Sequence, residues 1–360
     1  GSIKLDGQVG ATRLGDILIN DALNFTPSST INAKTLTQTT GTGTTQLNND
    51  VDTTGNITLN NGIINIGAAA NIISTSGDID LESLSGSMDL SGNITAVGNS
   101  VTLTSAANIT DPTSSATDIT AGDLTITANS GSVGASGTNN ELDTDVDTIT
   151  AAAGNNIYIY QKKAVALPSV VAAAGVVDIK ADGTITTTTV SANGGYAVNL
   201  YATAGDIMDT AGGLITGTAT SSLKASGIIG TITNPVDVNI TGDLWILAGA
   251  RQNEVSAILK GTVKGSAVTQ RVEIFEPSPP GLVIFNNHLM GGGNYGSGSV
   301  NGSILNRGYG TFVLTINDMY YMFYNKAMFP WLYKTTLPWA LSQGAIINSD
   351  FLKEPPATID

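Results

Sequence analysis

One short pattern of polar and apolar residues recurs along most of the chain. A glycine or asparagine is followed by a small polar residue and then by apolar, polar and apolar positions in alternation. Alternation over three to five residues, with β-branched side chains and Gly or Asn between the runs, predicts short β-strands. The clearest copies are Gly55–Leu59, Gly77–Leu81, Gly122–Ile126, Gly175–Ile179 and Gly242–Ile246, with looser copies at Asn99–Leu103, Asn155–Ile159 and Tyr196–Leu200.

The spacing of these copies is nearly constant. Ile57, Ile79, Val101 and Leu124 follow one another at steps of about 22 residues, and shorter apolar runs lie about ten residues after each copy. Over the whole series the period is about 21 residues, with two or three short strands in each. A fixed period in this range indicates a solenoid, a propeller or another repeat array.

The period and the strand pattern favour one of these architectures. Helical repeats would need apolar residues at a spacing of 3.6, a propeller blade needs about 40 residues, and a leucine-rich repeat needs a regular Leu spacing. The sequence therefore predicts an all-β fold, a single-stranded right-handed parallel β-helix with about 13 coils of about 21 residues. Gly or Asn at the corners is expected to supply positive φ, and Asp in the Gly-Asp corners to cap turns.

Two stretches depart from the period. The step from Ile126 to Ile157 is longer than one coil, which predicts a protruding loop or an extra strand at Asn139–Ile149. Tyr160–Lys163, followed by Pro168, predicts a second excursion from the coil.

Three segments follow from these patterns. Residues 1–285 are predicted to form the β-helix, 286–310 a Gly-rich hinge, and 311–360 an aromatic C-terminal segment, which holds half of the aromatic residues. Such a segment could cap the last coil, whose strand edges would otherwise be unpaired, or it could be an assembly or docking surface. The predicted interface residues are Tyr320, Tyr321, Phe323, Tyr324, Phe329, Trp331, Tyr333 and Trp339.

Composition and charge exclude several classes of function. Only 12% of residues are charged, and the net charge is −14, which argues against binding nucleic acid through a basic face. The chain has no Cys and one His, so neither a disulfide scaffold nor a mechanism with two histidines is possible. No apolar run is long enough to predict a membrane-spanning helix. The hydrophobic content of 41% argues against disorder.

Candidate chemistry is sparse. The densest acidic stretch is Glu141–Asp147, where alternation would place Asp143, Asp145 and Asp147 on one side of a strand as Ca²⁺ ligands, or as charges that discourage edge pairing. No other cofactor is predicted. Polysaccharide cleavage would need two carboxylates facing a cleft, and no such pair is recognisable. His288 has no partner motif for catalysis.

The repeats resemble those of the filamentous-haemagglutinin-like exoproteins of bacteria. The phrases that carry this resemblance are Gly55–Leu59, Gly122–Ile126, Ala128–Gly134, Ile229–Val238 and Pro279–Asn286. The resemblance covers about residues 1–290 and implies a secreted or surface protein on the outer face of a Gram-negative bacterium. The expected function is structural, as an adhesin, sheath or filament subunit that binds further copies of itself or a cell-surface polysaccharide. A β-helical polysaccharide lyase or hydrolase and a trimeric phage tail-spike are the alternatives.

Overall fold

The computed structural model describes residues 1–113, 117–137, 140–230, 234, 236–242 and 244–248, together with strands at 270–272, 301–306 and 310–315. Its side chains are described as far as residue 244. The described part consists of strands, turns and bends without a helix, and the strands stack in parallel as a β-solenoid of about 10 turns with a spacing near 22 residues. The predicted parallel β-helix is confirmed.

The chain divides into two units, Gly1–Gly183 with Thr189–Tyr196, and Thr184–Thr188 with Ala197–Asp360. The strands of the first unit are β1 (Ile3–Leu5), β2 (Val9–Ile19), β3 (Phe25–Pro27), β4 (Ile31–Gln38), β5 (Thr44–Leu47), β6 (Val51–Thr53), β7 (Ile57–Asn61), β8 (Ile63–Ile66), β9 (Asn71–Ser74), β10 (Ile79–Ser83), β11 (Met88–Leu90), β12 (Asn93–Ser105), β13 (Ile109–Thr110), β14 (Ile119–Ala128), β15 (Leu142–Asp145), β16 (Thr148–Ala153), β17 (Ile157–Gln161), β18 (Val165–Ala172) and β19 (Val177–Ala181). Strand β20 (Ile185–Ala192) has residues in both units. The second unit holds β21 (Val198–Ala202), β22 (Ile207–Gly217), β23 (Ser221–Ala225), β24 (Val238–Ile240), β25 (Leu244–Ala248), β26 (Gln270–Val272), β27 (Asn301–Asn306) and β28 (Gly310–Thr315).

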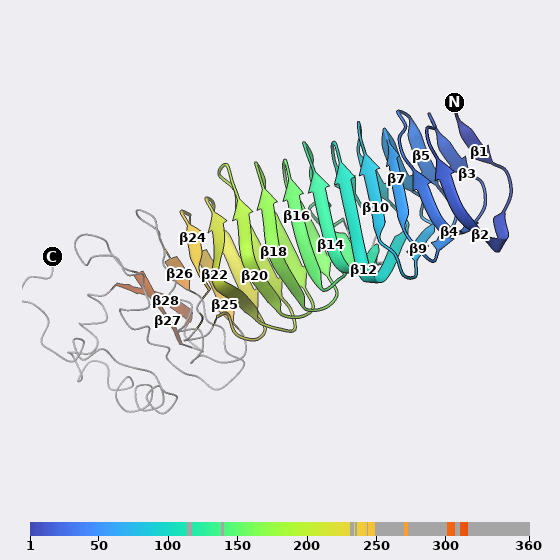
Figure 1. Ribbon diagram of the computed structural model, residues 1–360. Coiled ribbons are helices and arrows are strands. Elements are labelled where there is room, and N and C mark those ends of the chain that lie inside the picture. Colours follow the sequence, from blue (N-terminus) through green and yellow to red (C-terminus); the bar gives the residue numbers. More distant parts are fainter. Residues whose placement is uncertain are drawn as a thin grey trace, which may run out of the picture. The chain divides into compact units, whose positions relative to one another are not determined.

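Parallel ladders run through the first unit, and Figure 1 shows its strands lying side by side in successive layers. One ladder joins β1, β3, β5, β8, β11 and β13. In another ladder β7 pairs with β10, β10 with β12 and β12 with β14. Ile57 therefore pairs with Ile79, Ile79 with Val101 and Val101 with Leu124. These are the residues whose spacing gave the period.

The core is formed by the apolar positions of each alternating run. Ile57, Ile79, Val101 and Leu124 are each no more than 1% exposed, while the polar residue that follows each of them in its strand faces outward. Burying one such side chain stabilises the fold by about 1.5–3 kcal/mol. Because the same positions recur in each turn, the core is a continuous column of aliphatic side chains.

Side chains at the corners cap the backbone of the next turn. The Asn56 Oδ1 accepts a hydrogen bond from the Asp78 N–H at 3.2 Å, and the Asp78 Oδ1 accepts one from the Ser100 N–H at 2.9 Å. Asparagines also stack between turns, since the Asn93 side-chain amide donates to the Asn71 Oδ1 at 3.1 Å. The capping role predicted for Asp in the Gly-Asp corners is confirmed at Asp78, whose N–H partner lies one turn further along the chain, whereas the Asp123 Oδ1 accepts from the Thr148 hydroxyl instead.

The corner glycines serve close packing. Gly77, Gly122 and Gly175 are not among the glycines with positive φ, so the reason predicted for them is wrong. At Gly175 an added Cβ would lie 2.6 Å from the Asn156 backbone nitrogen and closer still to the Asn155 carbonyl group. Glycine is needed at this corner because the backbone of the preceding turn leaves no room for a side chain.

The two irregular stretches belong to the stack. Within Asn139–Ile149 the chain forms β15 and the start of β16, so the expected extra strand is present: Leu124 pairs with Ile149, whereas Ile157 pairs with Val133 and Val177. The second predicted excursion is wrong, because a corner of three residues joins β17 to β18. Pro168 is exposed in β18, where the register with β16 shifts.

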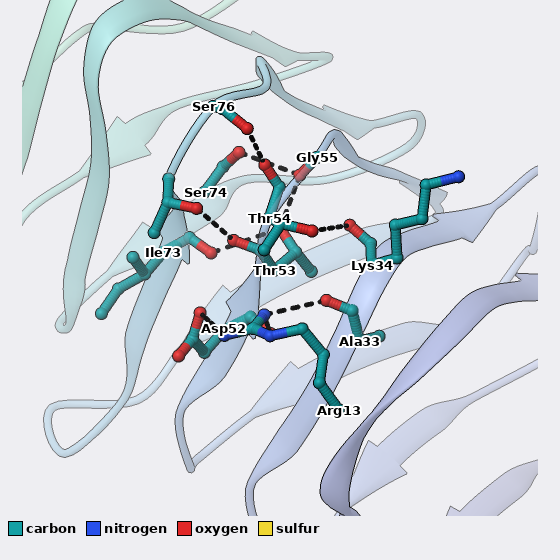
Figure 2. Close-up of polar contacts among 11 residues, drawn as sticks. Arg13, Ala33, Lys34, Asp52, Thr53, Thr54, Gly55, Ile73, Ser74 and Ser76 are labelled. Atoms are coloured by element: carbon teal, nitrogen blue, oxygen red, sulfur yellow. Dashed lines mark hydrogen bonds and ion pairs between the residues drawn. The ribbon is translucent and has the colours of Figure 1, made fainter.

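Polar side chains connect the first turns on their outer surface, as Figure 2 shows. The Arg13 guanidinium on β2 donates to the Ala33 carbonyl on β4 at 2.9 Å, and to the Asp52 carbonyl and carboxylate on β6 at 2.9 and 3.0 Å. Three successive strands are therefore held by one side chain. Beneath this surface, the Gly55 carbonyl accepts hydrogen bonds from two buried hydroxyls, that of Thr53 in its own turn and that of Ser74 in the following turn.

The second unit has the same internal arrangement. Leu200 pairs with Leu223 and Leu223 with Ile246, while Ile215 pairs with Val238. Strands β27 and β28 pair antiparallel, from Asn301 with Thr315 to Asn306 with Gly310. This hairpin spans the predicted boundary between the hinge of 286–310 and the aromatic segment of 311–360.

Candidate functional site

Three buried carboxyl groups meet where the chain passes from one turn of the first unit to the next. Asp111 follows β13, Asp118 immediately precedes β14, and Asp143 lies within β15, which pairs with β14. Each residue is 4% exposed or less, and one carboxylate oxygen from each lies within 4.8 Å of the other two. We call Asp111, Asp118 and Asp143 the aspartate cluster. Among the residues that the structure describes, it is the group of acidic side chains arranged closely enough to hold a metal ion.

The backbone holds the cluster in place. The Asp143 N–H donates to the Asp118 Oδ2 at 3.0 Å, and the Asp118 N–H donates to the Asp143 carbonyl at 3.0 Å. The Thr113 N–H and hydroxyl both donate to the Asp111 Oδ1 at 2.8 Å. The Asp111 Oδ2 is buried and has no hydrogen-bond partner among the described residues. An unpaired carboxylate oxygen in such a place is costly unless a proton or a cation satisfies it.

Burial and mutual repulsion make the cluster electrostatically strained. Burial, followed by the charge of Asp111, raises the pKa of Asp118 to about 9. Burial also raises the pKa of Asp143 to about 6, although the nearby Lys162 opposes that shift. Three carboxylates this close and this buried cannot all remain charged at neutral pH without compensation. The cluster can therefore take up a proton or a hard cation.

The three residues predicted as Ca²⁺ ligands do not lie together. Asp143 is buried in the aspartate cluster, whereas Asp145 and Asp147 each lie 3.1 Å from the Lys163 Nζ. The side chain of Asp147 is 72% exposed. The predicted alternation fails because Leu142, Asp143 and Thr144 are all buried in succession.

Sequence reasoning missed Asp111 and Asp118. Asp118 and Asp143 immediately precede the ladder partners Ile119 and Thr144, so they occupy equivalent positions one turn apart. Aligning the turns on this register, with the longer step that the Leu124–Ile149 pair requires, would have placed the two carboxyl groups side by side.

A second feature is the edge of the first turn. Strand β2 pairs with β4, and no described strand pairs with its other edge. Large apolar side chains on and next to this strand are exposed, namely Leu14 at 45%, Leu18 at 63% and Leu23 at 47%. Unpaired strand edges are templates for pairing with another chain.

The predicted aromatic interface lies outside the described residues. This applies to Tyr320, Tyr321, Phe323, Tyr324, Phe329, Trp331, Tyr333 and Trp339, and also to His288. Their assignment as an assembly surface stays a prediction.

No family model, no curated protein and no solved structure matches this chain. The resemblance to filamentous-haemagglutinin-like exoproteins therefore stays a prediction. The described residues contain no helix of the length and apolar character that crossing a bilayer requires.

Proposed function

We propose that this protein is a structural component of the bacterial cell surface or extracellular space, an adhesin, sheath or filament subunit that assembles through the ends of its β-solenoid. The observation that carries the proposal is the apolar surface at the edge of β2, where Leu14 is 45% and Leu18 63% exposed. A parallel ladder that stops at one strand offers the N–H and C=O groups of that strand to the next one.

The partner proposed for this edge is a second copy of the same chain. Two different ends that pair head to tail form a heterologous interface, and repetition of that interface produces an open filament. The regular ladders of the first unit support this proposal, because a neighbouring copy would continue a pairing geometry that the chain already repeats. The outward Thr, Ser and Asn side chains would remain available for contact with a cell-surface polysaccharide.

Light scattering and negative-stain microscopy of the full chain test this proposal. Replacing both Leu14 and Leu18 by Lys should convert filaments or oligomers to monomers, because each change puts a charge on the pairing edge. Val97→Lys is the matched control, since Val97 is 67% exposed within β12 and away from the edge. Assembly unchanged in the double variant, or lost equally in the control, would refute end pairing.

Removing residues 301–360 tests the predicted aromatic interface separately. Loss of assembly after this truncation, with the Leu14 and Leu18 variant unaffected, would move the interface from the β2 edge to the C-terminal segment. A trimer of fixed mass in either experiment would favour the tail-spike alternative.

Polysaccharide cleavage is the less favoured function. A glycosidase or lyase needs catalytic carboxyl groups that face a bound sugar chain. The aspartate cluster is the closest group of carboxyls in the described structure, and its members are at most 4% exposed. Incubation with acidic polysaccharides, followed by an assay for new reducing or unsaturated ends, tests this alternative.

A further inference from the structure

We propose that the aspartate cluster, Asp111, Asp118 and Asp143, is a Ca²⁺ site that joins two successive turns of the solenoid. It differs from the calcium site expected from the sequence, with which it shares only Asp143. It is also independent of end-to-end assembly, since it lies inside the first unit.

The arrangement of the oxygens points to a ligand. Three carboxylate oxygens converge within 4.8 Å, and the Asp111 Oδ2 is left without a hydrogen-bond donor although Asp111 is only 4% exposed. The Asp111 and Asp118 carboxyl groups also lie within hydrogen-bonding reach of one another, a contact that needs either a shared proton or a cation between them. A cation placed among these oxygens would satisfy the unpaired atom and neutralise the repulsion at once.

No nearby lysine satisfies the unpaired Asp111 Oδ2 among the described residues. Lys162 and Lys180 lower the pKa of Asp143, but neither forms an ion pair with the cluster in the described structure. Lys163 is occupied by Asp145 and Asp147. Among the described residues, therefore, no lysine or arginine forms an ion pair with the aspartate cluster.

The chemistry of the donors selects the ion. All three side chains offer carboxylate oxygen, which suits hard cations and not Zn²⁺, whose protein ligands are mostly sulfur and nitrogen. Mg²⁺ usually keeps several of its waters, and such a hydrated ion fits poorly among side chains this buried. Ca²⁺ accepts mono- and bidentate carboxylates in flexible geometry and so fits the cluster best.

Binding would have a structural consequence. Asp111 and Asp118 mark the two ends of the connection between β13 and β14, and Asp143 belongs to the following turn. An ion shared by all three would fix that connection against β15. Since the site is assembled only by folding, Ca²⁺ binding should raise the free energy of unfolding.

Calorimetric titration of the full chain with Ca²⁺, after removal of metals with a chelator, measures binding directly. We expect one Ca²⁺ per chain, and an increase of Tm with Ca²⁺ that exceeds the increase with equal Mg²⁺. Asp118→Asn should weaken Ca²⁺ binding at least about tenfold, because it removes one charged ligand. Asp147→Asn is the matched control, because it removes an acidic group close by in sequence that is already paired with Lys163.

Two results would overturn the proposal. One is an absence of Ca²⁺ binding by the unaltered chain at millimolar Ca²⁺, which needs no variant to fold. The other is loss of binding in Asp147→Asn with binding retained in Asp118→Asn, which would return the site to the exposed carboxylates. If Ca²⁺ has no effect and Asp118→Asn simply stabilises the protein, the cluster shares a proton instead of an ion.

Discussion

Replacing the corner glycine Gly175 by alanine should destabilise the first unit. The added Cβ would lie 2.6 Å from the Asn156 nitrogen and closer to the Asn155 carbonyl group, both of them backbone atoms of the adjacent turn. A backbone held by ladder hydrogen bonds on both sides cannot move as a flexible side chain can. The strain therefore has to be relieved by separating two turns locally.

The size of the effect follows from two opposing contributions. Overpacking by one methyl group in a well-packed place costs about 1–3 kcal/mol. Alanine also restricts the unfolded chain, which offsets about 0.4–1 kcal/mol of that cost. We expect Gly175→Ala to lower the free energy of unfolding by about 1–2 kcal/mol.

Two other glycines provide matched controls. At Gly122 the added Cβ would lie 3.2 Å or more from its neighbours, and at Gly15 it would meet nothing within 4 Å; neither has positive φ. Gly122→Ala should destabilise less than Gly175→Ala, because its contacts are longer, and Gly15→Ala should be neutral or slightly stabilising. Urea unfolding followed by circular dichroism measures all three. Equal stability of Gly175→Ala and Gly15→Ala would refute the argument that close approach of turns requires glycine at this corner.

Three further predictions concern single side chains. Gln161→Ala should lower the free energy of unfolding, measured with urea, by about 1–3 kcal/mol. The Gln161 side chain is buried and hydrogen-bonds both the N–H and the carbonyl of Val146. An unchanged free energy of unfolding would contradict this prediction. Arg13→Lys should lower the unfolding free energy by about 1 kcal/mol or less, because lysine cannot reproduce the forked contacts with Ala33 and Asp52; calorimetric unfolding at low and high salt checks this. Burial raises the pKa of Asp209 in the folded protein. Its ionisation should therefore reduce the free energy of unfolding as pH rises from about 4, the pKa in the unfolded chain, through the higher pKa of the folded protein. Asp209→Asn should flatten that part of the profile of Tm against pH.

Much of the fold could be predicted because the spacing of the repeated pattern along the chain directly gives the register of the parallel ladders. Residues 22 positions apart, such as Ile57 and Ile79, occupy identical places in successive turns, so their spacing is the register. The constant period ends between Leu124 and Ile149, where one turn is longer; the extra strand expected there is present, but its register could not be derived from the period. There the repeat phrase at Ile157 belongs to a different ladder, in which Val133 and the extra strand β15 are its partners in the preceding turn.

The candidate site was less accessible to sequence reasoning. Alternation correctly separates inward from outward positions in most strands, but it cannot tell whether an outward position is covered by another part of the chain. The alternation in Glu141–Asp147 groups Asp143 with Asp145 and Asp147 on the polar side of a strand, yet Asp143 is only 3% exposed. Asp111 and Asp118 belong to no repeat phrase, and their meeting with Asp143 depends on how the connection between two turns folds.

The side-chain caps at the corners have an evolutionary consequence. Asn56 satisfies a backbone group of the turn after it, and Asp78 does the same for the turn that follows. At these corners one turn thus provides a side-chain acceptor for the backbone of its successor. A gene for such a protein can gain or lose a whole turn by in-frame duplication or deletion and preserve every interface, whereas a change of a few residues within a turn must be accommodated at a corner.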